Sequence, residues 1–461
     1  MTSATGIAGA VRSGAASAVD IVEAHLARVR DANPRLRALA VVFADRARAE
    51  AARIDEIVAR GDDPGPLAGV PFSVKENIDL TWSATTQGWR GAVDAVPEAD
   101  ATIVRRLRRA GAIPIGRGNM PDFGMRFDTD NDLFGRTFNP FDPARTAGGS
   151  SGGDAVAVAT GMSAFGLGND FGGSIRIPAA ANGLFGLRPS VGRVPRAAVR
   201  DIPVALTLQQ FSVNGVLGTS VDDVETVFEA IAGPDADDPV SLDLPREPSW
   251  AAPRRVAVVR DPLGWGVDPE VAASVDSTAS RLQAAGWRID HVEPPRLEDA
   301  AVLWRRLACT DMLLTLGPGV LPVPLGASAT RFLRDSTAAA RPYETAAEYA
   351  AAWAERAVIA AEWRRFQVEH PVVLGPVWTS RVPPIDFDLG GQDAATAAWR
   401  DLRLTVAVNF LGLPAVAVPA GLDSGGVPIG VQLIGPMHGD RLALAAARDA
   451  TGPAGEVLSG D

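Results

Sequence analysis

Two glycine- and serine-rich segments, TAGGSSGGD at 146–154 and GNDFGGSIRIP at 168–178, carry most of the information in this sequence. Glycine lets a backbone approach a bound molecule closely and present its N–H groups. The first segment lacks the Lys-Ser or Lys-Thr that ends a Walker A loop. The second fits the dinucleotide pattern G-x-G-x-x-G only with one extra residue. The GGSIR sequence around Ser174 also differs from the G-x-S-x-G elbow of α/β-hydrolases. Taken alone, either segment is equally compatible with tight turns in a packed sheet.

An upstream lysine changes this interpretation. It lies in GVPFSVKENID (69–79), and the three segments together resemble the amidase signature family. GGSSGG (148–153) and DFGGSIRIP (170–178) resemble its two signature blocks, and 69–79 resembles its catalytic-lysine block. GRGNMPDFG (116–124) resembles its substrate-side loop, and LGLPAVAVPAG with GGVPIGVQLIG (411–435) is similar to its C-terminal strand pair. The resemblance implies an α/β fold with a large mixed central β-sheet flanked by helices on both faces.

We expect one amidase domain over 1–461. Its signature core, residues 65–195, would hold the catalytic residues. Residues 230–400, where the resemblance is weak, would form a variable and partly helical substrate-side segment. Local patterns predict a helix capped by Ser17, a helix over 41–59, a strand over 112–115 and a long helix over 340–366.

The resemblance implies a nucleophile, Ser174, a bridging serine, Ser150, and a base, Lys75, with a cis peptide before Ser150. A serine hydroxyl needs a positioned base, and lysine serves as one only when it is neutral. The pKa of Lys75 must therefore fall from about 10.4 toward roughly 7–8. We expect burial against Phe72, Val74 and the Gly-Ser core to lower it.

The remaining site residues are also implied by the resemblance. Oxyanion donors would be the backbone N–H groups of Phe171, Gly172, Gly173 and Ser174. Substrate contacts are expected from Gly118, Asn119, Met120 and Gly149. Structural support is expected from Ser151, Asp170 and Arg176, with Ser151 capping the following helix or bonding the oxyanion loop. Glu76 and Asn169 depart from the usual family pattern, and neither is expected to take a direct part in the chemistry.

Composition narrows the function classes. The 461 residues carry a formal net charge of −11, with a pI of about 5.0. This acidic balance argues against nucleic-acid binding and docking on anionic lipid.

One cysteine, Cys309, and four scattered histidines make a structural zinc site improbable, and no cofactor is expected. Cys309 lies in an apolar helical run and is interpreted as a buried, inert thiol. No signal peptide or membrane span is evident, so we expect a cytoplasmic protein.

Three functions remain open. The first is a stand-alone hydrolase of a small carboxylic amide, with carbamates (urethanes), esters and anilides as variants that the same relay would serve. The second is an amidotransferase subunit that works on aminoacyl-tRNA, and the third is a non-catalytic binding protein on the amidase fold. Large apolar residues between positions 190 and 400, including Phe211 and Trp304, favour a bulky apolar or aromatic acyl group. Family members often form homodimers, but the sequence does not fix the oligomeric state.

Overall fold

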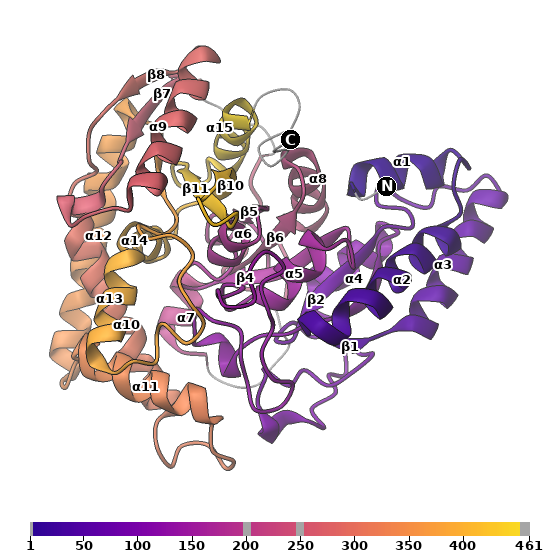
Figure 1. The fold of residues 1–461 in the computed structure, drawn as a ribbon, viewed down its shortest axis with the longest axis horizontal. Coiled ribbons are helices and arrows are strands. Elements are labelled where there is room, and N and C mark those ends of the chain that lie inside the picture. The colour runs from indigo at the N-terminus through magenta and orange to yellow at the C-terminus, as the bar shows by residue number, and fades with distance from the viewer. Residues whose placement is uncertain (1–2, 197–203, 246–252, 452–461) are drawn as a thin grey trace.

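The computed structural model describes residues 3–196, 204–245 and 253–451. One mixed sheet runs through it (Figure 1), in the order β1-β3-β2-β4-β6-β5-β10-β11-β9-β7-β8. The strands are β1 (Leu39–Val42), β2 (Pro71–Lys75), β3 (Ile113–Gly118), β4 (Phe165–Asp170), β5 (Phe185–Arg188), β6 (Val213–Gly218), β7 (Arg255–Val258), β8 (Arg288–Asp290), β9 (Val372–Pro376), β10 (Ala415–Leu422) and β11 (Pro428–Ile434). β2 runs parallel to its neighbours β3 and β4, whereas β10 and β11 form an antiparallel pair.

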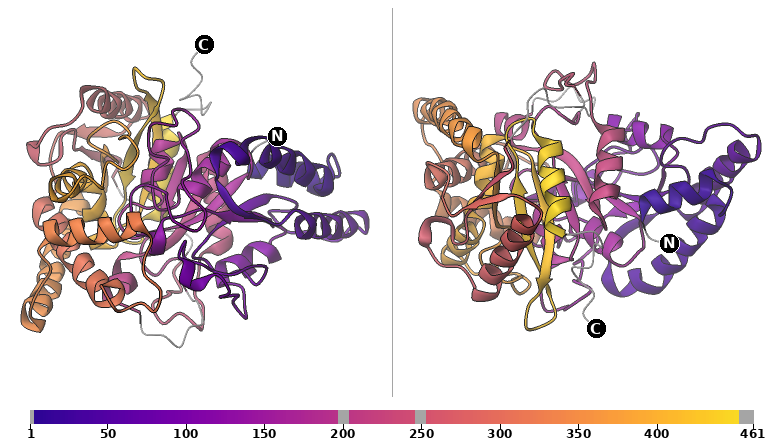
Figure 2. Two further views of the ribbon diagram at one scale, coloured as in Figure 1. Left: turned by 60° about the horizontal axis from the view of Figure 1, so that its bottom comes forward. Right: turned by 90° about the horizontal axis from the view of Figure 1, so that it is seen from above.

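Helices cover both faces of this sheet (Figure 2). Alternate residues of β10 show the two faces, because Val416 and Val418 pack into one apolar core and Ala415 and Ala417 into another. The helices that contribute to the first core are α1 (Ala4–Arg12), α2 (Ala18–Leu36), α3 (Ala44–Ala59), α4 (Thr102–Arg109), α8 (Val221–Ile231), α9 (Pro269–Ala284) and α15 (Asp440–Thr451). The second core includes residues of α5 (Gly152–Ala159), α6 (Arg176–Ala181), α7 (Leu206–Phe211), α10 (Leu297–Leu316), α11 (Ala327–Ala340), α12 (Ala346–Glu369), α13 (Gln392–Asp401) and α14 (Arg403–Leu411). The expected α/β fold with helices on both faces is confirmed.

The alternation along β2 decides which side chains reach the candidate site. Phe72 and Val74 belong to the first apolar core, where Phe72 stacks on Phe165 with 5.0 Å between ring centroids. Ser73 and Lys75 therefore point to the opposite face, which α5 covers. The expectation that Phe72 and Val74 desolvate the Lys75 amine was wrong, because successive strand residues face opposite sides of a sheet.

Local predictions held where a capping signal was present. Ser17 caps α2, and its hydroxyl accepts the N–H of Asp20 at 3.0 Å. The helix predicted over 41–59 begins only at Ala44, since the edge strand β1 precedes it. The long helix predicted over 340–366 begins only at Ala346, as α12, because Arg341 adopts a left-handed conformation that ends α11 at Ala340. Residues 246–252 of the predicted variable segment lie outside the described residues.

None of the helices in the described ranges is long and apolar enough to cross a membrane.

Candidate active site

The Gly-Ser segment forms a tightly packed loop that leads into α5. Its Gly149–Ser150 peptide bond is cis. A Cβ at Gly148, whose φ is +76°, would lie 2.7 Å from Pro178 Cα, and one at Gly149 would lie 2.7 Å from the backbone of Arg126. Neither contact is tolerable, so the sequence needs glycine at both positions for the loop to fit against its neighbours. For Gly149, expected as a substrate contact, the structure shows this packing role.

Lys75, at the end of β2, makes the central contact of the site. Its Nζ lies 2.8 Å from Ser150 Oγ and donates to Asn169 Oδ1 at 2.7 Å. Asn169 Nδ2 in turn donates to Asn77 Oδ1 at 2.7 Å, which fixes the orientation of the Asn169 amide. Asn169 was expected to take no direct part, but its side chain contacts the candidate base.

The environment of Lys75 favours the neutral amine. The side chain is fully buried. Burial lowers its pKa to about 7, against the attraction of the Asp154 and Asp170 carboxylates, which favour the charged form. With a pKa of about 7, the neutral and the charged form of Lys75 coexist near neutral pH.

Ser174 lies beside this pair, in the turn between β4 and α6. The N–H of Ser151 donates to the Ser174 carbonyl at 3.2 Å, so the two serine-bearing segments are joined directly. Ser174 retains 5 % exposure, against 2 % for Ser150. Within the described ranges no hydrogen bond joins the Ser150 and Ser174 hydroxyls, and the hydrogen bond of Ser150 Oγ is with Lys75 Nζ.

The backbone around Ser174 presents N–H groups without acceptors. In the part of the chain that the structure describes, the N–H groups of Phe171, Gly172 and Ser174 have no hydrogen-bond acceptor. Gly173 differs from the expectation, because its N–H donates to Asp170 Oδ1 at 2.8 Å. Three of the four predicted donors are thus free to bind an oxyanion.

Asp170 and Arg176 form the buried pair that was expected to support this turn. Arg176 Nε and Nη2 donate to the two Asp170 carboxylate oxygens at 3.0 and 3.1 Å, and neither side chain is exposed. Burial acts to raise the pKa of Asp170, but Arg176 and Arg188 outweigh it and hold that pKa well below its ordinary value. A permanent carboxylate therefore anchors the turn.

Ser151 does not cap α5 as expected. It occupies the N-cap position, but its side chain makes no capping bond, and its buried hydroxyl has no partner among the described residues. The Ser151 Oγ lies 2.7 Å from where a Cβ at Gly168 would stand, so the hydroxyl fills the space left by that glycine. Its backbone N–H, not its hydroxyl, contacts the loop of Ser174.

The predicted substrate-side residues have mostly structural contacts. Asn119 donates to the Gly135 carbonyl at 3.0 Å and accepts from the Met120 N–H and from Asn131 Nδ2. Its amide therefore has hydrogen-bond partners within the protein on both its oxygen and its nitrogen, and the substrate contact expected from Asn119 stays a prediction. Gly118 leaves room for the Asp154 carboxyl. Met120 is fully buried, and its Cε lies near Gly124, as does Ser150 Oγ.

An aromatic cluster borders the turn between β4 and α6, which carries Ser174. Trp304, from the variable segment, donates its Nε1–H to the Phe171 carbonyl at 3.1 Å and stacks at an angle on the Phe171 ring. Its ring would lie 2.7 Å from a Cβ at Gly172. Trp399 and Phe127 continue the cluster, with 5.3 Å from Trp304 to Trp399 and 5.2 Å from Trp399 to Phe127. The sequence could indicate Trp304 as a candidate but not its contact with the turn.

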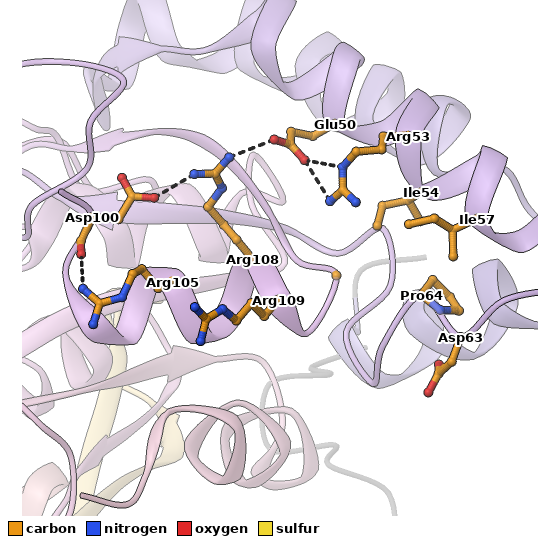
Figure 3. Close-up of a pocket in the computed structure, with 11 residues that line it drawn as sticks. Glu50, Arg53, Ile54, Ile57, Asp63, Pro64, Asp100, Arg105, Arg108 and Arg109 are labelled. Carbon is orange, nitrogen blue, oxygen red and sulfur yellow. Dashed lines mark hydrogen bonds and ion pairs between the residues drawn. The ribbon is translucent and has the colours of Figure 1, made fainter. Parts of the chain in front are cut away.

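Other features of the molecule lie outside this site. A hollow of about 550 Å³ lies at α3 and α4. Among its lining residues, Arg108 bridges Glu50 and Asp100 at 2.8 and 2.7 Å (Figure 3). The hollow is lined by none of the candidate catalytic residues. Cys309 is buried as expected, and burial raises the pKa of its thiol to about 12. Among the described residues, no group of His, Cys, Asp and Glu side chains is arranged to hold a metal ion.

The buried amine of Lys75 thus lies at the end of a strand, beside a cis Gly-Ser peptide and a glycine-rich turn that bears a second serine. The family model described as Amidase matches residues 20–444. The chain belongs to this family, whose members are the amidase signature enzymes.

Individual relatives differ in what they act on. The chain is 37 % identical over 450 residues to an indoleacetamide hydrolase of Bradyrhizobium diazoefficiens, covering 96 % of this chain and 85 % of the relative. It is 33 % identical over 467 residues to a glutamyl-tRNA(Gln) amidotransferase subunit of a Synechococcus species, covering 95 % and 94 %. Its structure is similar to that of a bacterial aryl acylamidase of the amidase signature family, with a TM-score of 0.84, 25 % identity and coverage of 99 % and 96 %. The structure of 6-aminohexanoate cyclic dimer hydrolase gives the same TM-score at 26 % identity, with 99 % of both chains covered.

The buried pair under the turn generates a stability prediction. We expect Arg176→Ala to lower the free energy of unfolding by about 3–5 kcal/mol, because it leaves the Asp170 carboxylate buried without its main partner. Urea denaturation followed by circular dichroism measures this. Arg448→Ala, which removes a half-exposed ion pair with Asp222, should cost less than about 1 kcal/mol. Equal costs for the two variants would contradict the anchoring role of Asp170 and Arg176.

Proposed function

We propose that the protein hydrolyses a carboxylic amide through an acyl-enzyme on Ser174, with Ser150 as the bridging serine and Lys75 as the base. One observation carries the proposal: the amine of Lys75, buried and with a pKa of about 7, lies 2.8 Å from Ser150 Oγ. A general base works best when its pKa lies near the working pH, and a serine nucleophile needs such a base.

In the proposed reaction, Ser174 attacks the carbonyl carbon while its proton passes to Ser150 and a proton from Ser150 passes to Lys75. The N–H groups of Phe171, Gly172 and Ser174 are placed to stabilise the oxyanion of the tetrahedral intermediate. The C–N bond then breaks as Ser150 protonates the leaving nitrogen and recovers its proton from Lys75. Water attacks the acyl-enzyme, loses its proton through the same relay, and restores the Ser174 hydroxyl as the carboxylic acid leaves.

We further propose that the acyl group is aromatic and the leaving group small. Support comes from the aromatic cluster of Phe171, Trp304 and Trp399 beside the turn of Ser174. These rings offer their π-faces to an aryl group of the substrate. The hydrolase of indoleacetamide among the similar proteins agrees with this chemistry, because indoleacetamide carries its aromatic ring on the acyl side. The aryl acylamidase supports anilides as further substrates, since an anilide carries its ring on the leaving amine. Anilides, aryl carbamates and aryl esters are secondary substrates in this proposal, because each presents a carbonyl to the same relay.

Replacement of the three proposed catalytic residues tests this mechanism. We expect Ser174→Ala to lower kcat/KM for an arylacetamide by at least about 10³-fold. Lys75→Ala and Ser150→Ala should each lower it by about 10²–10⁴-fold, since each removes a step of the proton path. The effect is measured, and the substrates are ranked, by the release of amine, ammonia or alcohol from a panel. The panel holds an aliphatic amide, an arylacetamide, an anilide, an aryl carbamate and an aryl ester.

Ser151→Ala is the matched control, because this neighbouring serine has a buried hydroxyl without a partner in the described part of the chain. We expect it to retain activity within about tenfold of the wild type, well above the losses expected for the relay variants. A loss at Ser151 as large as that at Ser150 would contradict the assignment of the bridging serine.

The pH dependence should follow Lys75. Because the neutral amine is the active form, kcat/KM should fall as the pH drops through about 7, where Lys75 takes up a proton. Initial rates with a neutral arylacetamide between pH 5 and 9 measure this limb. A rate that rises only toward the ordinary pKa of lysine would contradict a neutral base at pH 7.

The 33 % identity to a glutamyl-tRNA(Gln) amidotransferase subunit, over 94 % of its length, supports one alternative: a chain that works on aminoacyl-tRNA together with partner proteins. We expect the purified chain alone to hydrolyse simple amides. Activity that appears only when partner proteins and aminoacyl-tRNA are added would favour the alternative. A cytoplasmic location, a homodimeric assembly and a single domain over 1–461 stay predictions.

A further inference from the structure

The Asp154 carboxyl lies inside the protein on the same face of the sheet as Lys75. Its helix, α5, begins two residues after Ser150 and packs against β2, β3 and β4. The side chain is fully buried; Oδ1 accepts the hydroxyl of Ser73 at 2.7 Å, and Oδ2 has no partner among the described residues. A buried carboxyl with one free oxygen is costly, and nothing in the hydrolytic mechanism above uses it.

Two glycines show where this carboxyl stands relative to Lys75. A Cβ at Gly118 would lie 2.2 Å from Asp154 Cγ, and one at Gly166 would lie 3.0 Å from Asp154 Cβ. In the sheet, Gly118 is the register partner of Lys75 on β3, and Gly166 is the partner of Ser73 on β4. The carboxyl therefore occupies space that these two strands leave open directly over residues 73–75.

We propose that Asp154, anchored by Ser73, is a positioning residue for this site: its carboxylate keeps the buried amine of Lys75 basic enough to accept a proton from Ser150. The inference rests on the proposed function of Lys75. A fully buried lysine without a counter-charge becomes a weak base, because burial penalises the ammonium form. A negative charge buried near the amine stabilises the ammonium form and so restores part of the basicity of the lysine.

The charges around the pair agree with this role. Attraction by Asp154 is the largest effect that opposes burial in the pKa of Lys75, ahead of Asp170 at the end of β4. Burial raises the pKa of Asp154 to about 7, against the Ser73 hydrogen bond and the attraction of Lys75. Glu76, the residue after β2, adds a further acidic group, and Arg117 on β3 adds a buried cation. Lys75 and Asp154 thus change charge in the same pH range.

The sequence offers a direct readout, because Lys75 is the only lysine in the chain. Protein grown with ¹⁵N-ζ-labelled lysine should give a single side-chain nitrogen resonance, whose chemical shift reports the charge of Lys75 across the pH range. This measurement does not depend on hydrolysis, so the inference can fail separately from the proposed function.

We expect Asp154→Asn to move the Lys75 titration to lower pH by about one pH unit or more, since removal of a nearby opposite charge disfavours the ammonium form. The acid limb of kcat/KM should move in the same direction, and the rate on the alkaline plateau should fall because the amine is a weaker base. A merely structural residue would lower the rate at every pH without moving either curve.

Ser73→Ala is the second variant, and it keeps the carboxyl. Without the hydroxyl the carboxylate is less stable, so the Lys75 titration should move in the same direction by a smaller amount. Asp440→Asn is the matched control, because Asp440 is also a fully buried carboxyl held by a serine, Ser190, at 2.9 Å. It should leave the Lys75 titration unchanged. An unmoved Lys75 titration in folded Asp154→Asn, or in Ser73→Ala if the first variant fails to fold, would overturn the inference.

Discussion

The buried amine of Lys75 is the group on which the architecture of the site depends. Burial removes the water that would keep the amine charged, so its pKa falls to about 7. A hydrogen bond to the fixed amide of Asn169 then holds the amine in one orientation, with Ser150 Oγ at 2.8 Å. Because an amine with this pKa accepts a proton near neutral pH, a lysine can take the place that histidine holds in a Ser-His-Asp triad.

Close packing of backbone segments brings the two serines to this amine. The glycines at 148 and 149 let the loop of Ser150 lie against Pro178 and the backbone of Arg126. The Asp170 carboxylate supports the turn of Ser174, because it pairs with Arg176 and accepts a hydrogen bond from the N–H of Gly173. This arrangement leaves neighbouring N–H groups free, and it places the aromatic ring of Trp304 against the same turn. The proposed nucleophile, oxyanion donors and acyl-binding rings thus share one rigid support.

The sequence predicted the elements with strong local signals and the chemistry carried by contiguous motifs. The Ser17 cap follows from a short-range pattern, and the motif residues Lys75 and Ser150 do meet in space. The interior partners of the motif could not be predicted in this way. Asn169 contacts Lys75, and Asp154 is buried against β2 and β3, only because β4 and α5 fold against these strands, and no local pattern encodes these pairings.

The same limit explains what the sequence missed or misplaced. The partners of Asn119 could not be read from its motif, because Asn131 and Gly135 contact its amide from across the loop. Phe72 and Val74 are neighbours of Lys75 in sequence, yet the alternation of the strand places them on the other face of the sheet.

The proton path from Ser174 through Ser150 to Lys75 is tested most directly by the identity of the acylated residue. An activated aryl ester would be mixed with the enzyme, quenched in acid within the first turnover, and digested for peptide mass spectrometry. The proposed path predicts one acyl group per chain, on Ser174, and its loss in Ser174→Ala. Acylation of Ser150 or Ser151, or turnover without any covalent intermediate, would contradict it.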